Sequence, residues 1–435
     1  MGFIGLVKNA AYNIKDSYRS IRRTDSNILV FIVYGLLYDM VINLYKPFAL
    51  KFLDRMGGAA IHISLYNSLP GFVAMFALLP GTILVGKFQK KKRVTTVFFS
   101  IGRSLILSLA VIPFMPSAFR PMAFVLFIAV INFFDAVSQC SLQSFLGETF
   151  NGFTRAKAIS LRNKFGVFFT LLITMLTGVA ITYIPKTDGQ RIFLYQLFFI
   201  LAFTIGVFEI ITFNKFKTKK TAEPGQDGEG FEKATWRAAA ATLKDKKFMK
   251  YLLITMCFNF AWYVGWPLSG IFQIKSLNSN ELWLALVVVA SGIGSFFTAS
   301  YWPKIINKKG NDFAIFIASV GLALNMLLSA VCPNLIVFAL INVMAGAAST
   351  GYNITILNGL LIATPDKHRV IFIGVYNTFA NALLAASPLL SYYMYSVTGV
   401  RWSMAVTGFL RVIAGAVLLI HYFRLKKKGG AEAPA

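Results

Sequence analysis

The stretch Lys87-Phe-Gln-Lys-Lys-Lys-Arg93 is a short basic loop between two apolar runs. A second loop of the same kind, Lys304-Ile-Ile-Asn-Lys-Lys309, follows in the other half of the chain. Asn163 and Asn377 also stand at equivalent places, each eight residues after an arginine. The chain therefore repeats one plan once. In membrane proteins, two such halves usually enclose a binding site between them.

The composition places the chain in a lipid bilayer. Of its 435 residues, 57% are hydrophobic and 14% are charged, whereas soluble proteins carry roughly 25% charged residues. The net charge of +26 does not indicate nucleic acid, because the basic residues lie in short loops and form no continuous soluble face. Three cysteines, Cys140, Cys257 and Cys332, lack metal-ligand spacing, so we expect no metal and no cofactor.

Twelve apolar runs approach or exceed the roughly 20 residues that a helix needs to cross a bilayer. This pattern predicts an all-α polytopic membrane protein with 12 transmembrane helices. The runs are 27–49, 63–85, 94–114, 121–146, 164–184, 191–213, 249–272, 282–302, 313–332, 334–361, 371–394 and 402–423.

The runs form two groups of six. The only long polar stretch lies between them and contains Glu223-Pro-Gly-Gln-Asp-Gly-Glu-Gly230, a composition typical of a disordered linker. The predicted division is a 1–26 N-terminal segment, a 27–213 six-helix bundle, a 214–248 central linker, a 249–425 six-helix bundle and a 426–435 tail.

The distribution of lysine and arginine predicts the orientation, because cytoplasmic loops are enriched in these residues. Placing both termini and the central linker inside the cell puts 33 of the 43 Lys and Arg residues on the cytoplasmic side. Arg162, between the fourth and fifth runs, is counted with a cytoplasmic loop. We therefore expect a multi-pass protein of the cell (plasma) membrane with both termini cytoplasmic. The same charges would attract anionic membrane lipids.

The six-plus-six arrangement, the long central loop and the basic loop after the second helix of each half resemble the major facilitator superfamily. The resemblance covers roughly residues 25–425. Gly86 stands where that family carries an acidic residue in the loop. The resemblance implies two pseudo-symmetric bundles that alternate access to a midplane site. It also implies a cytoplasmic gate, to which we assign Lys87, Lys90, Lys91, Arg155 and Arg369.

Two carboxylates lie in the middle of apolar runs, where each costs at least about 2.5 kcal/mol to insert. They are Asp39 in the first run and Asp135 in the fourth. Glu209 lies close to the cytoplasmic end of the sixth run, where we expect it to reach the lipid headgroups or pair with a lysine. Asn43 shares the helical face of Asp39, while Asn132 and Gln139 share that of Asp135. Such polar stripes should face protein or water rather than lipid. We expect these residues to take part in proton coupling or to line the cavity.

The second half carries amides and aromatic residues at the corresponding places. The seventh run contains Asn259, Trp262 and Tyr263, and the tenth contains Ser349 and Asn353. In the superfamily, the first, fourth, seventh and tenth helices line the central cavity. The resemblance therefore implies an asymmetric cavity, with acids on one side and amides and aromatic rings on the other.

Three basic residues bear on how the acids are used. Arg103 and Arg411 lie within apolar runs and are the available intramembrane charge partners. Lys46 lies one turn from the outer surface, so we expect its side chain to extend outward. Two interpretations stay open for each acid: proton coupling, or an ion pair that only joins helices.

The sequence thus predicts a secondary active transporter of a small organic solute, acting as a monomer by alternating access and coupled to protons. Efflux of an amphipathic or cationic compound is slightly favoured, because acids are the only mid-span charges on the expected cavity helices. The alternatives are an uptake symporter for a polar solute such as a sugar, a flippase for a lipid-linked substrate, or a non-transporting membrane scaffold. The flippase is supported by the basic cluster of Lys46, Lys51 and Arg55 after the first run. The sequence predicts no enzyme, because the runs contain no nucleophile–base pair or metal set.

Overall fold

The computed structural model describes residues 26–86, 91–150, 152–217, 237, 239–365 and 369–428. These residues form helices and short connections, and no β-strand is present among them. The N-terminal bundle comprises α2 (Ser26–Tyr45), η1 (Lys46–Phe48), α3 (Ala49–Arg55), α4 (Ala60–Gly86), α5 (Lys91–Leu109), η2 (Ile112–Phe114), α6 (Arg120–Thr149), α7 (Gly152–Tyr183) and α8 (Asp188–Asn214). The C-terminal bundle comprises α10 (Lys246–Ile271), η3 (Phe272–Ser276), α11 (Glu281–Thr298), α12 (Tyr301–Lys309), α13 (Asn311–Ala330), α14 (Leu335–Ala363) and α15 (Arg369–Lys428).

Polar side chains begin several of the long helices. Thr187 and Gln190 form a capping box at the start of α8. Asp245, Asn280 and Asn334 accept hydrogen bonds from the first free backbone amides of α10, α11 and α14. These caps satisfy donors that a helix start would otherwise leave unpaired next to an apolar layer.

The last helix is two helices joined at a glycine. Gly399 in α15 has φ of 76°, a left-handed value that glycine adopts without strain. Within the described residues, ten helices are long and apolar enough to cross a membrane; one of them contains both segments of α15, and α4 adds a further 27-residue apolar helix. The all-α polytopic fold is therefore confirmed, and the arrangement is consistent with twelve membrane-spanning helices.

The predicted runs match the long helices closely except in one place. The fifth run was expected to start at residue 164, whereas α7 already begins at Gly152. Hydropathy marks where a helix enters the apolar layer, and the polar first turns of α7 precede that point. As a result Arg162, expected in a cytoplasmic loop, lies on a helix that packs against α2.

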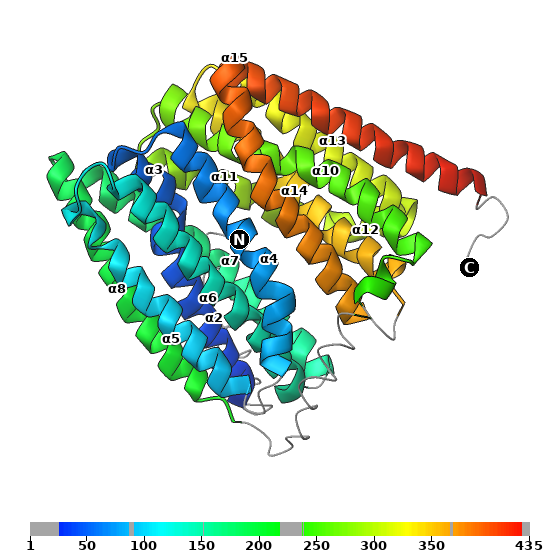
Figure 1. Cartoon of the computed structure of the whole chain (residues 1–435), viewed down its shortest axis with the longest axis horizontal. Coiled ribbons are helices and arrows are strands. Elements are labelled where there is room, and N and C mark those ends of the chain that lie inside the picture. Colours follow the sequence, from blue (N-terminus) through cyan, green and yellow to red (C-terminus); the bar gives the residue numbers. More distant parts are fainter. Residues whose placement is uncertain are drawn as a thin grey trace, which may run out of the picture.

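Figure 1 shows the two bundles side by side, with α4 and the first segment of α15 at the seam between them. The main contacts between the bundles are made by α4 with α15 and by α7 with α11. Glycines allow the helices to approach closely at both crossings. A Cβ atom on Gly71 would lie 2.8 Å from the backbone of Ala385, and one on Gly178 would lie 2.6 Å from the Cβ atom of Ala285.

Ion pairs fasten the bundles together at the end that carries η1, α3 and η3, which we name the η1/η3 end. Arg55 of α3 contacts Glu281 of α11 at 2.8 Å, and Lys275 of η3 pairs with Asp54 of α3. Among the described side chains, both ion pairs that join the two bundles lie at this end. The halves are therefore closed against one another there.

Candidate functional site

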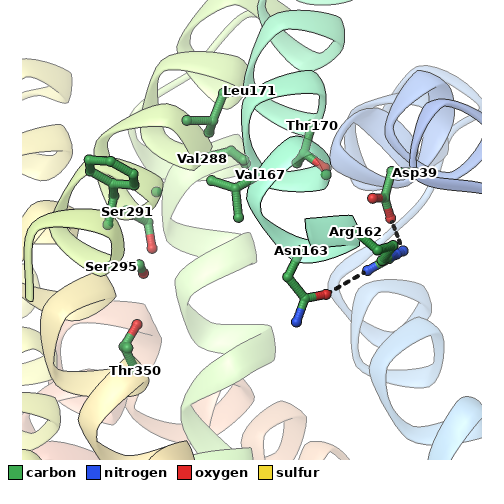
Figure 2. A pocket seen from close by; sticks show the side chains of 13 residues that line it. Asp39, Arg162, Asn163, Val167, Thr170, Leu171, Val288, Ser291, Ser295 and Thr350 are labelled. Carbon is green, nitrogen blue, oxygen red and sulfur yellow. Dashed lines mark hydrogen bonds and ion pairs between the residues drawn. The ribbon is translucent and has the colours of Figure 1, made fainter. Parts of the chain in front are cut away.

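A pocket of about 560 Å³ lies between the two bundles. Helices α2 and α7 form its wall on the N-terminal bundle, and α11 and α14 form the opposite wall (Figure 2). The residues that line it are Asp39, Arg162, Asn163, Gly166, Val167, Thr170, Leu171, Val288, Ser291, Gly292, Ser295, Phe296 and Thr350. Both halves of the repeat thus contribute to one cavity.

An ion pair stands on the N-terminal wall of this pocket. Arg162 Nη2 of α7 donates to Asp39 Oδ1 of α2 at 2.6 Å. Arg162 Nη1 donates to Asn163 Oδ1 at 3.3 Å. The Asp39 and Arg162 side chains are 14% and 25% exposed, so solvent in the pocket reaches both. Figure 2 shows the two side chains pointing toward one another from neighbouring helices.

Two glycines make room for this ion pair. Gly35 precedes Asp39 by one turn of α2, and a Cβ atom there would lie 2.5 Å from Arg162 Nε. Gly166 follows Arg162 by one turn of α7, and a Cβ atom there would lie 2.5 Å from Asp39 Oδ2. Each helix thus supplies one charged group and one notch that receives the charged group of the other. A larger residue at either position would force the charged side chain opposite it to shift.

Asn43 extends the polar contact between α2 and α7. Its Nδ2 donates to the backbone oxygen of Asp39 at 2.7 Å and to Thr170 Oγ1 at 3.2 Å. Thr174 Oγ1 donates to Asn43 Oδ1 at 3.4 Å. Asp39 and Asn43 therefore share a helical face, as their spacing predicts, and that face is turned toward α7.

The C-terminal wall is uncharged. It presents the hydroxyls of Ser291, Ser295 and Thr350, which lie across the cavity from the ion pair in Figure 2. Ser295 Oγ also donates to the backbone oxygen of Gly346 at 3.0 Å. Apolar side chains, including Val288, complete the wall. The pocket can therefore hold a molecule with one charged or polar end and an apolar body.

Asp135 belongs to a separate, buried charge cluster inside the N-terminal bundle. Arg103 Nη1 donates to Asp135 Oδ1 at 2.9 Å, and Arg103 Nε and Nη2 donate to the two carboxylate oxygens of Glu209 at 2.8 and 3.2 Å. The ring of Tyr38 lies 5.3 Å from the guanidinium carbon. Arg103 and Glu209 are fully buried and Asp135 is 6% exposed. The expected pairing of Asp135 with Arg103 is therefore present.

Lys46 differs from the expectation that it extends outward. Its Nζ atom donates to Asn132 Oδ1 at 3.4 Å, which directs the side chain toward α6 inside the bundle. Asn132 in turn donates to the backbone oxygen of Ile128. The prediction was wrong because the side chain finds a polar partner on the neighbouring helix, which hydropathy along one helix cannot reveal.

The predicted amide and aromatic residues of the second half form a network within the C-terminal bundle. Asn259 donates to Tyr376 Oη at 3.2 Å and accepts from Tyr352 Oη at 2.9 Å. The rings of Trp262 and Tyr263 stack, with centroids 5.9 Å apart. None of these residues is among the described residues that line the pocket.

Arg411 also differs from its expected role. Its guanidinium donates to the backbone oxygens of Ala261, Leu322 and Trp262 at 3.2, 2.8 and 3.0 Å. No carboxylate pairs with it among the described residues. Asp39, one of the acids it was expected to neutralise, is paired with Arg162 instead. Carbonyl oxygens of α10 and α13 thus take the place of an acidic partner.

The other predicted site residues lie away from the pocket or outside the described part of the chain. Gln139 is half-buried and hydrogen-bonds with Tyr38. Ser349 donates to the backbone oxygen of Gly346 at 3.1 Å, and Asn353 is exposed. Of the predicted gate residues, Lys87 and Lys90 lie outside the described residues, whereas Lys91, Arg155 and Arg369 are described only as helical backbone.

Sequence reasoning therefore found one pocket residue, Asp39, and missed its partner Arg162. The signal for Arg162 was that the fifth apolar run can be extended backward as a helix, which places Arg162 on that helix rather than in a loop. Glu209 was also underestimated, because it was expected at a membrane surface. An arginine inside an apolar run is a signal to look for every acid at its depth.

Two six-helix bundles, closed together at one end and sharing a pocket, define a polytopic membrane transporter. A model of the Major Facilitator Superfamily matches residues 27–361, which is most of the chain, so the protein belongs to this superfamily. No curated protein sequence matches the chain.

Solved structures agree with this assignment. A mutant of the nucleoside transporter NupG superposes with a TM-score of 0.73 at 13% identity, covering 90% of this chain and 99% of that chain. A POT family transporter in complex with a thioalcohol-conjugated peptide gives 0.67 at 11% identity, covering 92% and 96%. A bacterial homolog of the human lysosomal transporter Spinster, inward-facing and unoccupied, gives 0.63 at 13% identity, covering 94% and 98%. At these identities the likeness is one of fold.

Proposed function

We propose that this protein is a secondary active transporter that carries a small organic solute through the pocket and couples its movement to protons at Asp39. The observation that carries the proposal is the Asp39–Arg162 ion pair on the pocket wall. A carboxylate that faces both the solute space and a permanent cation can gain or lose a proton as the solute binds. Asp39 is therefore the proposed coupling residue.

Asp135 receives a different role in this proposal. Its partner Arg103 is fully buried and also pairs with Glu209, and none of the three is among the described residues that line the pocket. Buried, fully enclosed ion pairs of this kind fix the packing of helices. We therefore assign Asp135, Arg103 and Glu209 to the integrity of the N-terminal bundle and leave proton coupling to Asp39.

The proposed orientation follows from the lysine and arginine distribution. It puts the η1/η3 end on the outside of the cell membrane, so that the ion pairs there close the external side. Transport then requires the bundles to part at that end and to meet at the other. The contacts of α4 with α15 and of α7 with α11 are the proposed surfaces over which the bundles rock.

The flippase alternative loses its main support. It rested on a basic cluster after the first helix, where an anionic lipid headgroup could bind. Lys51 pairs with Asp54 at 3.2 Å, Arg55 pairs with Glu281 at 2.8 Å, and Lys46 contacts Asn132. Each of these three cations thus already has a partner among the side chains of the protein.

The proposal is tested by proton flux in proteoliposomes loaded with a pH-sensitive dye, using a panel of organic solutes. We expect at least one solute to move protons with the wild-type protein. Asp39→Asn should abolish this proton movement while solute exchange without a gradient persists. Asp188→Asn, which changes an exposed acid of α8, is the matched control and should retain coupling. Unchanged proton movement in Asp39→Asn, or a panel in which no solute moves, would refute the proposal.

A further inference from the structure

We infer that the transported solute is an organic anion, which binds Arg162 at the moment when Asp39 takes up a proton. This inference rests on the proposed transport function and specifies its substrate class. It makes the protein a proton–anion symporter, because the proton and the anion enter the same site together. The argument has three parts: the charge states open to the pocket, the surroundings of the ion pair, and the shape of the cavity.

The described lining of the pocket has two charge states. Asp39 and Arg162 are the charged residues in it. The guanidinium of arginine stays protonated throughout the physiological pH range. Among the described lining residues, protonation of Asp39 is therefore the one titration available, and it changes the lining from neutral to singly positive. The net charge of the lining thus alternates between 0 and +1 and is never negative. When Asp39 is protonated, the positive lining favours an anion.

The charged groups around the pair do not alter this count. On α5, α6 and α8, Arg103 pairs with both Asp135 and Glu209, so this cluster has one more negative than positive charge. On α2 itself, Lys46, bonded to Asn132, adds one positive charge, so these four groups sum to zero. The residues that α11 and α14 present to the pocket are apolar, glycine or hydroxyl-bearing. Asp39 thus has one cationic partner in contact, Arg162, and losing the carboxylate charge leaves that partner unpaired.

The geometry suits an anion once the carboxylate is neutral. Arg162 Nη2 is the atom bonded to Asp39, while Nη1 contacts Asn163 on the pocket wall. Release of Nη2 would expose two neighbouring donors of one guanidinium, which match the two oxygens of a carboxylate or phosphate. The Asn163 amide group stands beside them. Buried in a largely apolar pocket, an unpaired guanidinium gains most from such a partner.

The rest of the cavity defines the body of the solute. Its volume of about 560 Å³ falls within the range of small-molecule sites. Val167 and Phe296 offer apolar surface, and the hydroxyls of Ser291 and Thr350 face the ion pair from the other bundle. An anion with a ring or short chain would therefore bridge the two bundles, with its charged group on α7 and its body against α11.

A cationic solute fits the observations less well. It would have to displace Arg162 from Asp39, and so break a hydrogen-bonded ion pair of 2.6 Å. The displaced guanidinium would then stay in the pocket next to the bound cation. The expectation of a cationic solute relied on acids being the only charges of the cavity, and the position of Arg162 removes that reason.

The test is ligand-induced thermal stabilisation of the purified protein at pH 5.5 and pH 7.5. The probes are organic acids with their matched amides and amines, of which phenylacetate, phenylacetamide and phenethylamine form the smallest set; phenyl phosphate separates a preference for phosphate from one for carboxylate. We expect stabilisation by anions alone, with an affinity that rises by up to about tenfold per pH unit on acidification, as one linked proton allows.

Variants identify the groups responsible. Arg162→Gln should weaken anion binding by about 10- to 100-fold, the range of one or two charge-assisted hydrogen bonds. Asp39→Asn should bind anions equally well at both pH values. Arg191→Gln, on the exposed start of α8, is the control and should bind as the wild type does. The inference is overturned if amines or amides stabilise the protein better than acids, if no acid stabilises it, or if Arg162→Gln binds acids normally. If the protein couples protons to a cationic or neutral solute, the inference of an anionic solute is overturned, while the proposed transport function stands.

Discussion

Arg55 of α3 and Glu281 of α11 join the two bundles through a hydrogen-bonded ion pair, with Arg55 Nε 2.8 Å from Glu281 Oε1. Tyr195 Oη donates to the same oxygen at 3.1 Å. The Glu281 side chain is 1% exposed, and its Oε2 atom has no hydrogen-bond partner among the described residues. Arg55 also contacts Asp188 at 2.9 Å. The carboxylate of one bundle is thus enclosed by the other bundle.

The first prediction concerns this connection. Arg55→Gln leaves the Glu281 carboxylate buried without its cation, a change that costs about 3–5 kcal/mol at buried pairs. Separation of the bundles relieves that cost by hydrating the carboxylate, so the η1/η3 end should open more often. In a background without Cys140, Cys257 and Cys332, a cysteine placed at Ala285, fully buried at the α7–α11 crossing, should react at least about tenfold faster with an impermeant thiol reagent.

Two controls decide whether this effect comes from the joined bundles. Arg191→Gln breaks a pair with Asp188 at 3.0 Å and a hydrogen bond to the backbone oxygen of Ile181 at 3.3 Å, both within the N-terminal bundle, and should leave the labelling rate unchanged. Arg55→Gln combined with Glu281→Gln removes both charges and should label more slowly than Arg55→Gln alone. Equal labelling of Arg55→Gln and the wild type would show that the ion pair does not hold this end closed.

The second prediction uses the notch at Gly166. In Gly166→Ala, the new methyl group would lie 2.5 Å from Asp39 Oδ2, so the carboxylate must move away from Arg162. Helix stability should not fall, because alanine favours a helix over glycine by about 1 kcal/mol. We expect solute-driven proton flux to drop by about tenfold or more, the effect of losing one well-placed charge-assisted hydrogen bond, with no fall in the thermal unfolding midpoint.

Gly189→Ala is the matched control, since no atom lies within 4 Å of the added methyl group. It should transport like the wild type. Retention of full flux in Gly166→Ala would mean that the Asp39–Arg162 contact is dispensable. A lowered unfolding midpoint with unchanged flux would assign the pair to helix packing instead.

The sequence predicts the fold far better than the site, and the reason is physical. Only helices and closed β-barrels satisfy the backbone in lipid, and continuous apolar runs of about 20 residues fit helices rather than the shorter strands of a barrel. Eleven of the twelve runs therefore match their helices to within a few residues. The start of α7 at Gly152 is the exception, since a helix can continue into water and hydropathy does not record that continuation.

The site depends on which helical faces meet, and one sequence carries little information on that. Polar spacing correctly placed Asp39 and Asn43 on one face but could not identify α7 as its neighbour. Arg162 was counted with a loop, and so the cavity was expected to be acidic. Asp135 and Arg103 were paired correctly because both lie inside apolar runs, where an unpaired charge is costly.

The third prediction tests the role assigned to the buried cluster. Arg103→Met would leave Asp135 and Glu209 buried without a cation, so the protein should lose about 3–5 kcal/mol of stability and express poorly. The triple variant Arg103→Met, Asp135→Asn, Glu209→Gln removes all three charges and should recover most of that loss. Thermal unfolding in detergent measures both. If the triple variant is stable but no longer couples protons, the cluster also takes part in coupling, which our assignment excludes.

The fourth prediction concerns Arg411, whose guanidinium bonds to three backbone oxygens within the C-terminal bundle. Gly265 of α10 leaves the space for it, because a Cβ atom there would overlap Arg411 Nη2. Gly265→Ala should therefore push the guanidinium away from the oxygens of Ala261 and Trp262. The loss of charged hydrogen bonds inside an apolar bundle should cost about 2–4 kcal/mol of stability, measured by thermal unfolding.

Gly415→Ala is the matched control, since its added methyl group would meet Ser319 Cβ at 3.7 Å, an ordinary contact. This variant should keep an unfolding midpoint near that of the wild type. Equal midpoints for the two variants would show that Arg411 can leave its three carbonyl partners without cost, and that its burial has another cause.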